Sequence, residues 1–507
     1  MATLLKKGVL QPVLGLDHSQ PSTLINYQNG FPQNMRYTRG EIRKREGSRS
    51  LGSESVPIAG ENGVQHTVVY PTSSESIRLI RCSKQTIELF NTVSSAWDNI
   101  TGSLILTGDD DSYWDDAVVN DKLILTNYVN NLLSYTDGDS GVAEVAGSPP
   151  NCKFLEYLSP YLVAGFVSTG VNNHMIVKWP DTGTLTSWST GNASSALLDH
   201  NGDAIRGLKR LNEYCVAYKK ASIYLGRPVS TSEVIKWDLQ EVGTGLMNHR
   251  TVAEHKGNHY FMGLNDFHVF NGVRSESIGQ KIREQVFLSR NAERDSRHHA
   301  VHVKDYDEVW FFIVSIGNDW PSDIWKYNYR YDFWYYDTCD RYRTGTEWFI
   351  QASTTIDDLV GTIDEQGGSI DNYLSTTNAP SYVFGTQFGL TLRLDPTTNN
   401  DRLTVPISAR YDSGDLTGEI FENYKRWLML DFWAKGNALT VFYSTDYGDS
   451  WKKVKEVELT GSISQHRVYF DVVAEHIRFR FENREAGQTF FLRQFQAYYT
   501  IREDVSR

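Results

Sequence analysis

Acidic side chains gather in one short stretch that could serve a carboxylate-based enzyme. Asp109-Asp110-Asp111 and Asp115-Asp116 flank Trp114 in a turn that follows Gly108. Glycoside hydrolysis needs two carboxyl groups on either side of a cleft, and one of them must have a raised pKa. Because these acids lie next to one another in a single turn, we expect a solvated turn or a weak cation site rather than a catalytic pair.

Three histidines and a second acidic turn are the remaining candidates for a metal site. His298, His299 and His302 precede a strand expected at Val309–Val314. In an extended chain His298 and His302 lie about 13 Å apart, too far for one ion, whereas on a helix they could share zinc. No glutamate completes a zinc-protease motif, so surface histidines are expected. Residues 137–141, Asp-Gly-Asp-Ser-Gly, lack the rest of a twelve-residue calcium loop, and we expect a turn there.

One motif has a defined geometry. The octapeptide from Ser444 to Trp451 matches Ser-x-Asp-x-Gly-x-x-Trp, the Asp-box. Asp446 can accept backbone N–H groups, Gly448 supplies a positive φ, and Trp451 packs under the turn. Sialidase propellers usually carry several copies, whereas this chain has one clear copy. A structural turn is therefore expected, with a sugar enzyme as the alternative.

Other signatures of catalysis are missing from the sequence. It contains no phosphate-binding Gly-x-x-x-x-Gly-Lys loop, no Gly-x-Ser-x-Gly and no Gly-x-Gly-x-x-Gly after a strand. We therefore expect no catalytic residue, no cofactor and no metal, and we expect that the protein is not an enzyme.

The elements that would position these residues are almost all β-strands. Val309–Val314 reads as a buried strand, Ile324–Tyr329 alternates between two faces, and Trp334–Tyr336 opens a third extended piece. A strand, a polar turn and a second strand ending in an aromatic residue are typical of the inner part of an antiparallel blade. The best helix candidate, 278–291, is short.

Weaker versions of this pattern recur along the chain. Their centres fall near residues 80, 124, 163, 216, 261, 311 and 360, a spacing of about 40 to 55 residues, which suits four-stranded propeller blades. The sequence therefore predicts an all-β protein with a β-propeller of about six to eight blades over residues 61–395. A string of separate β-sandwiches is the alternative.

The two ends of the chain differ from this array. Seven strand-like runs between Thr404 and Tyr499 predict an antiparallel β-sandwich over residues 396–507. The boundary at Asp395–Asn400 has the composition of a linker. Residues 1–60 are irregular and polar, so they are expected to form an extended N-terminal arm, laid on the main body or on a neighbouring subunit.

The arm carries a cluster of cations. Six of them lie within one strand-turn-strand length: Arg36, Arg39, Arg43, Lys44, Arg45 and Arg49. One interpretation is a solvated hairpin paired to nearby acids. The other is an edge that contacts phosphate groups or bridges to a neighbouring subunit.

Composition limits the classes of function. The formal net charge of −12 makes a generally basic, nucleic-acid-wrapping protein an unlikely class, although a local basic patch stays open. The four cysteines are scattered singly, as expected for buried thiols in a reducing cytosol. We find no stretch that could span a bilayer, and the first fifteen residues have no apolar core of the length that a secretion signal needs.

Several stretches together resemble a known group of proteins. The arm contains Gly-x-Ile-Arg-Lys-Arg-x-Gly-Ser, ending at Ser48, and one blade contains Ile205-Arg-Gly-Leu-x-x-Leu-x-x-Tyr and Lys219-Lys-Ala-Ser-Ile-Tyr. Another blade has Val309-Trp-Phe-Phe, Trp325-x-Tyr-Asn-Tyr and Trp334. The order of arm, blades and sandwich is similar to the propeller-containing tail proteins of short-tailed bacteriophages, the tail nozzle and packaged-DNA-stabilisation (head-closure) group. The similarity is a diffuse pattern over most of the chain.

This resemblance implies a structural virion protein of the tail, assembled in the host cytoplasm. Members of the group form rings, often sixfold, around the DNA channel below the portal, and they retain packaged DNA and pass it at ejection. The implied partners are further copies of the chain in a hexamer, the portal or adaptor and other tail proteins, and transiting double-stranded DNA bound without sequence preference. Two alternatives stay open: an Asp-box glycoside hydrolase, and a carbohydrate- or receptor-binding propeller.

Overall fold

The chain is built almost entirely from β-strands, which confirms the expected class. The computed structural model describes residues 5–6, 16–19, 30–38, 40–52, 63–74, 76–168, 170–229, 233–349, 380–418 and 423–501. Among them only α1 (Arg283–Ser289) is an α-helix, inside the stretch where the sequence predicts one. Within the described residues, no helix has the length and apolar character needed to cross a membrane.

Six four-stranded antiparallel arrays follow one another along the chain, each built from consecutive strands. They are β6 (His66–Pro71), β7 (Ile77–Cys82), β8 (Ile87–Asn91), β9 (Ala96–Asn99); β10 (Asp115–Val119), β11 (Lys122–Thr126), β12 (Leu133–Tyr135), β13 (Ala143–Glu144); β14 (Cys152–Leu158), β15 (Tyr161–Val167), β16 (Ile176–Trp179), β17 (Ser194–Leu197); β18 (Ile205–Leu211), β19 (Tyr214–Lys219), β20 (Ser222–Pro228), β21 (Ile235–Val242); β22 (Val252–His255), β23 (Asn258–Met262), β24 (Phe267–Phe270), β25 (Ser275–Ser277); and β26 (His299–Val303), β27 (Glu308–Ile313), β28 (Asp323–Asn328), β29 (Phe333–Thr338).

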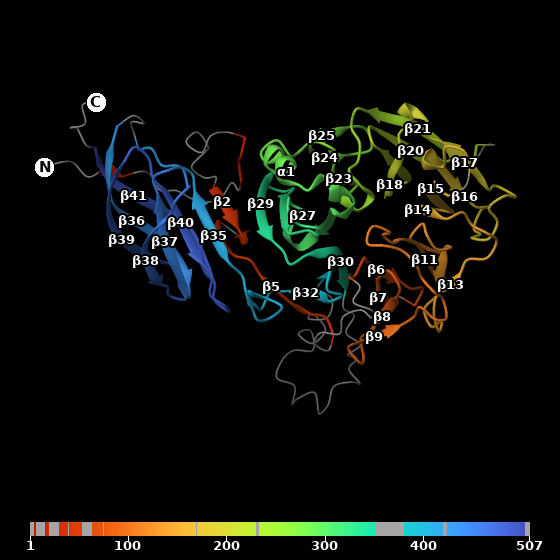
Figure 1. Cartoon of the computed structure of the whole chain (residues 1–507), viewed down its shortest axis with the longest axis horizontal. Helices are drawn as coiled ribbons and strands as arrows, with labels where there is room; N and C mark the ends of the chain where they lie inside the picture. The colour runs from red at the N-terminus through yellow and green to blue at the C-terminus, as the bar shows by residue number, and fades with distance from the viewer. Residues whose placement is uncertain are drawn as a thin grey trace, which may run out of the picture.

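A seventh array combines strands from distant parts of the chain. It has the order β30 (Tyr342–Phe349), β31 (Pro380–Thr386), β32 (Thr391–Asp395) and β5 (Gly47–Ser50). The seven arrays succeed one another around a common centre (Figure 1). The architecture is therefore propeller-like. The strand pair predicted around residue 360 lies outside the described residues.

Alternation along the strands explains why neighbouring arrays pack face to face. In β27, Val309 and Phe311 enter a core that also holds Phe267 of the preceding array. Trp310 and Phe312 point the other way and share a core with Phe384 of the following array. Because successive side chains of a strand leave opposite faces, one aromatic strand contributes to the cores on both of its sides. The predicted pairing of the three strands is confirmed, with β28 between β27 and β29.

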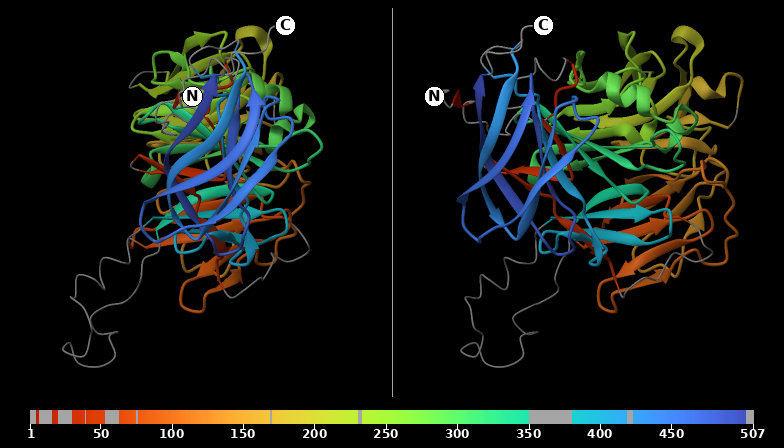
Figure 2. Two further views of the ribbon diagram at one scale, coloured as in Figure 1. Left: turned by 90° about the vertical axis from the view of Figure 1, so that its left-hand side faces the viewer. Right: turned by 60° about the vertical axis from the view of Figure 1, so that its left-hand side comes forward.

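The C-terminal strands form two sheets around a separate core. One sheet has the order β3-β4-β41-β36-β39, with β1 beside β41, and the other has the order β2-β35-β40-β37-β38. Their bounds are β1 (Leu5–Lys6), β2 (Gly30–Gln33), β3 (Met35–Thr38), β4 (Glu41–Lys44), β35 (Ala409–Ser413), β36 (Lys425–Gly436), β37 (Ala438–Ser444), β38 (Lys452–Glu458), β39 (Ser464–Ala474), β40 (Arg478–Asn483) and β41 (Phe490–Ile501). Trp427, Phe432, Phe481, Phe495 and Tyr499 fill the core. Figure 2 shows these strands as a block beside the propeller-like body. A short ribbon, β33 (Asn400–Asp401) with β34 (Val405–Pro406), lies between the two bodies in sequence.

Residues 30–50 join the two bodies. β2 pairs with β29 of the sixth array, where Gln33 faces Tyr336, and on its other side with β35. One nine-stranded sheet thus runs from the propeller-like body into the C-terminal block. The hairpin β3–β4 extends the other C-terminal sheet, and β5 completes the seventh array. Of the two placements expected for the N-terminal arm, these residues take the one on their own chain.

Candidate functional site

A cavity lies where the first strands of all seven arrays meet, and we call it the central cavity. Its volume is about 410 Å³. The residues that line it from these strands are His66, Thr67 and Val69 of β6, residues 115–118 of β10, Leu155 and Glu156 of β14, Lys209 of β18, Val252 of β22, His299 and Ala300 of β26, and residues 344–346 of β30. Because strand side chains alternate, polar groups on these strands face the cavity while their neighbours fill the cores between arrays.

Two carboxylates of β10 bind histidines across this cavity. Asp116 Oδ1 lies 2.7 Å from His66 Nε2 of the first array, and Asp115 Oδ1 lies 2.9 Å from His249 Nε2. The other oxygen of Asp115 accepts the backbone N–H of Leu155 at 2.7 Å. Burial favours the neutral acid, but His249 and these hydrogen bonds outweigh it and hold the pKa of Asp115 below its ordinary value. The acids of β10 therefore connect several arrays.

The third carboxylate of the cavity has the opposite character. Glu156 accepts the backbone N–H of Arg210 at 2.8 Å, yet its pKa is raised, chiefly by burial. Lys209 lines the same cavity without a hydrogen-bond or ion-pair partner among the described residues. Burial would lower its pKa, but the nearby Glu156 and the acids of β10 raise it. An ionised Asp115 and a carboxyl group of raised pKa thus line one cavity.

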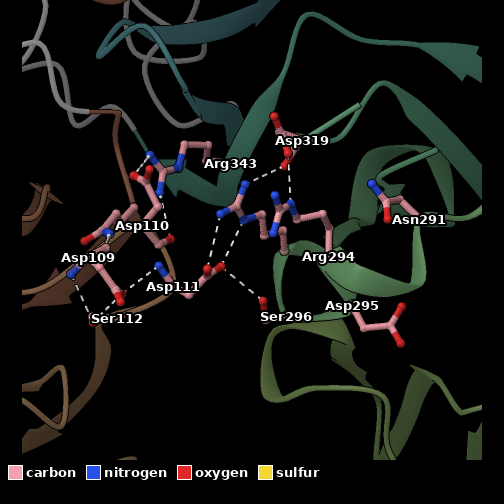
Figure 3. Close-up of polar contacts among 12 residues, drawn as sticks. Asp109, Asp110, Asp111, Ser112, Asn291, Arg294, Asp295, Ser296, Asp319 and Arg343 are labelled. Carbon is pink, nitrogen blue, oxygen red and sulfur yellow. Dashed lines mark hydrogen bonds and ion pairs between the residues drawn. The ribbon is translucent and has the colours of Figure 1, made fainter. Parts of the chain in front are cut away.

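The acidic turn before β10 binds cations of the first and seventh arrays and of the segment just before the sixth. Asp110 accepts Lys84 Nζ at 2.8 Å and lies 3.4 Å from Arg343 Nη1. Asp111 binds Arg297 in a fork, with Nε at 2.9 Å and Nη2 at 3.2 Å (Figure 3). Asp109 is engaged within the turn, where Ser112 Oγ donates to it at 2.7 Å. Asp109 and Asp111 are exposed and Asp110 is half-buried, so the expected solvated turn is confirmed, although Lys84, Arg297 and Arg343 of the same chain also bind Asp110 and Asp111.

The second acidic stretch is a turn, as predicted. Asp137 receives Arg78 Nε and Nη2, both at 2.9 Å, and Asp139 accepts the backbone N–H of Thr136 at 3.0 Å. Among the described residues, no group of three or more His, Cys, Asp or Glu side chains could hold a metal ion.

The prediction of surface histidines near residue 300 is wrong for two of the three. His298 and His299 are 0% and 3% exposed. The backbone N–H of Val314 donates to His298 Nδ1 at 3.2 Å, and the His299 ring stacks on Phe312 with centroids 4.3 Å apart. His302 is half-buried, and its ring lies tilted against that of His255, with centroids 4.5 Å apart. The sequence pattern did not reveal this burial, because the covering residues, Phe312 and Val314, lie more than ten positions further along the chain.

The arm cations bind groups of their own chain. Arg36 and Arg43 both pair with Glu46. Lys44, 1% exposed, donates to Asn483 and to the carbonyl of Glu485. Arg39 lies outside the described residues. The pairing of Arg36 and Arg43 with an acid matches the interpretation of a solvated hairpin paired to nearby acids, but the hairpin is not fully solvated, because Lys44 and Arg45 are buried.

The last two cations of the arm contrast with each other. Arg45 forms a fork with Asp401, through Nη1 at 3.0 Å and Nη2 at 2.7 Å. The Arg49 side chain, 41% exposed, pairs with Asp395 at 3.1 Å. Arg45 is thus committed to the fold, whereas Arg49 keeps an accessible face.

The Asp-box residues lie in one hairpin turn between β37 and β38. Ser444 Oγ donates to Asp446 Oδ1 at 2.6 Å and accepts the backbone N–H of Gly448 at 2.9 Å. Gly448 has φ +97°, a conformation that only glycine adopts without strain. Trp451 lies under a guanidinium, with Arg480 Cζ 3.9 Å from the ring centroid. This turn is on the C-terminal block, away from the central cavity.

Comparisons with known proteins add little to this geometry. No family model matches the chain, and no curated protein does. Among solved structures, the computationally designed Ika8 protein is 9% identical, with a TM-score of 0.38, over 76% of this chain and 99% of that one. The extracellular domain of a one-component system protein from B. thetaiotaomicron is 10% identical, with a TM-score of 0.41, over 80% of this chain and 48% of that one. At TM-scores below 0.5, neither similarity carries an argument.

Proposed function

We propose that this protein is a structural component of a bacteriophage tail that forms a homo-oligomeric ring around the DNA channel below the portal. The observation that carries the proposal is the path of residues 30–50, which tie the propeller-like body and the C-terminal block into one continuous sheet through β2. Because the two bodies share hydrogen-bonded strands, they would move together as one unit in the wall of a ring. The sequence resemblance to tail nozzle and head-closure proteins supplies the biological setting.

The fold that goes with this proposal is a closed propeller of seven blades. The four-stranded arrays would be the blades, and β5 from the N-terminal segment would lock the last blade to the first. Two observations support this: the first strands of all seven arrays line one cavity, and Leu79 and Phe90 of the first array share a core with Val383 of the seventh. Pairing β5, which precedes the first array, with β32 of the seventh would close the ring and leave only short edges.

The negative net charge of the chain is compatible with a channel through which DNA passes. Each chain carries a formal net charge of −12, so a ring of such chains repels phosphate at distances within a Debye length, about 8 Å at physiological salt. Repulsion lets DNA slide without adhering, whereas dense cations would hold it by counterion release. Of the described arm cations, Arg49 is the one we propose for DNA or subunit contact, because its side chain is 41% exposed, more than those of Arg36, Arg43 and Arg45. The neighbours of the ring would be the portal or adaptor and other tail proteins of the virion.

The proposal is tested by assembly. Particles built with Arg49→Ala should assemble with weaker DNA retention if Arg49 touches DNA, and should fail to assemble if it bridges subunits. If such particles assemble and retain DNA like wild type, the arm cations have neither role. A purified chain that stays monomeric, with no incorporation into particles, would overturn the tail proposal as a whole.

One observation favours a second candidate, the glycoside hydrolase. The central cavity brings together an ionised Asp115 and Glu156, whose pKa is raised, and such a pair is what acid-assisted sugar hydrolysis uses. Both acids are bonded to backbone amides, which suits a structural role equally well. A panel of fluorogenic glycosides decides between the roles: turnover that Glu156→Gln abolishes supports the enzyme, and no turnover by the wild type rejects it.

A further inference from the structure

A second cavity adjoins the central one, and we call it the mouth pocket. Its volume is about 520 Å³, and it shares Trp114, Asp115, His249 and Arg250 with the central cavity. The remaining wall comes from the acidic turn, from the second, third and fourth arrays, and from residues 247–248 and 295–296, which precede the fifth and sixth arrays. This size is within the range of pockets that bury a small molecule.

Every carboxylate of the mouth pocket already has partners. Asp115 binds His249, and Asp111 binds Arg297. Asp295 pairs with Arg290 and accepts His298 Nε2 at 3.2 Å. Asp109 accepts Ser112 Oγ within its turn. The negative charge of the pocket is thus neutralised or locked by the protein itself.

Its cations are not neutralised in the same way. Lys153, Arg206 and Arg250 have no carboxylate within ion-pair distance in the described parts of the chain. Arg206 Nη1 donates to the carbonyl of Met247 at 2.8 Å, and Arg250 Cζ lies 4.0 Å from the Tyr113 ring centroid. Burial lowers the pKa of all three, that of Arg250 to about 10. Lys153 is exposed, whereas Arg206 and Arg250 are half-buried. Leaving these two guanidinium groups without an anion is costly, and a bound anion would offset that cost.

The wall beside these cations is aromatic. Lys153 Nζ lies 4.2 Å from the Phe166 ring centroid and 5.3 Å from that of Tyr128, and those two rings meet edge to face at 5.6 Å. Phe154 lies next to His249, with centroids 5.0 Å apart. Phe154, Phe166 and Tyr128 are only half-buried, so their rings offer faces to a flat or ring-shaped ligand.

We propose that the mouth pocket binds a small organic anion carried on a ring, of the class of acidic sugars and nucleotides. Lys153 and Arg206 would contact the carboxylate or phosphate, Arg250 would add positive potential from below, and Phe166 and Tyr128 would cover the ring. This site is independent of the proposed tail role, since it uses no residue of the N-terminal segment or of the C-terminal block.

Calorimetric titration of the full chain tests the proposal with two matched pairs of probes: glucuronate against glucose, and uridine monophosphate against uridine. We expect one charged probe to bind with a Kd below about 1 mM and its neutral counterpart to bind at least about 10-fold more weakly. Glucuronate binding identifies an acidic-sugar site, and uridine monophosphate binding identifies a nucleotide site.

Variants connect the binding to the residues. Lys153→Gln and Arg206→Gln should each weaken the charged probe about 10-fold, as expected for a charged hydrogen bond. Lys122→Gln is the matched control, because Lys122 is exposed on β11 and does not line the pocket. Circular dichroism and a thermal melt verify that each variant is folded. The proposal is overturned if neither charged probe binds, if a neutral probe binds equally well, or if Lys153→Gln and Arg206→Gln are both folded and bind like wild type.

Discussion

Replacing Arg45 by alanine distinguishes an arm that holds its own chain together from one that reaches for DNA or a neighbouring subunit. Arg45 is 9% exposed. Besides its fork with Asp401, it donates to the carbonyl of Glu46 at 3.0 Å and lies 3.7 Å from Asp337, which is fully buried. The guanidinium thus sits between the N-terminal segment, the sixth array and the short ribbon that contains Asp401.

The expected loss in the free energy of unfolding follows from the buried carboxylates that Arg45→Ala leaves without a partner. Removing one partner of a buried ion pair costs about 3–5 kcal/mol, because the remaining charge is buried without compensation. Lys326 also pairs with Asp337, so the carboxylate of Asp337 keeps one cationic partner when Arg45 is removed. We therefore expect Arg45→Ala to lower the free energy of unfolding by about 3 kcal/mol, the lower end of the range. Arg49→Ala is the control: the Arg49 side chain is 41% exposed, and its buried partner Asp395 keeps its hydrogen bonds from Thr397, so we expect a loss of about 1 kcal/mol or less.

Hydrogen exchange is the assay, because it reports local opening without requiring two-state unfolding of a large chain. Amides of β2 and β5 in Arg45→Ala should exchange about 100-fold faster, which corresponds to about 3 kcal/mol, and those in Arg49→Ala should change less than about 5-fold. If exchange is unchanged in Arg45→Ala while particle assembly fails, Arg45 acts between molecules and the reasoning is refuted.

Three further predictions concern other parts of the molecule. Burial lowers the pKa of His259 to about 4, so this imidazole binds a proton in the unfolded chain at pH 5 and not in the folded one; stability should fall by about 2 kcal/mol between pH 7 and pH 5 on its account. Urea unfolding at both pH values should show a smaller loss for His259→Gln, and equal losses would contradict this. Asn34 has φ +54° and its side chain binds Thr338 and the carbonyl of Ser408; Asn34→Ala should cost about 3 kcal/mol and Asn34→Gly about 1 kcal/mol less, measured as melting shifts, with equal losses arguing against backbone strain. Gly448→Ala should destabilise the Asp-box turn by about 1 kcal/mol, since its Cβ would come within 2.9 Å of Arg478 at a positive φ; unchanged exchange in the turn would count against this.

The fold could be predicted largely from the aromatic strands. The stretch from Val309 to Thr338 carries period-2 alternation and clear turn residues, so its three strands and their order were evident from the pattern. The repeat centres, however, fall on β7, β11, β15, β19, β23 and β27, which are the second strands of their arrays. These strands are apolar on both faces, whereas the first strands mix polar and apolar residues because one side faces the cavity.

The same difference explains why the candidate site could not be predicted. Glu156, Lys209 and His249 lie on first strands or just before them, in stretches whose hydrophobic signal is weak. Their juxtaposition depends on the radial arrangement of the arrays, which brings residues some fifty positions apart in sequence to one cavity. Similarly, the ion pairs of Arg45 and Arg49 join residues separated by more than three hundred positions. The spacing of charges within the arm therefore could not predict these partners.

The proposed tail function requires that the chain, whose two bodies share one nine-stranded sheet, associates with copies of itself. The mass of the native assembly, measured for the purified chain and for tail complexes released from particles, tests it most directly. A ring should give a discrete species at about six times the 57.8 kDa of the chain. A single 57.8 kDa species in both preparations would contradict the account.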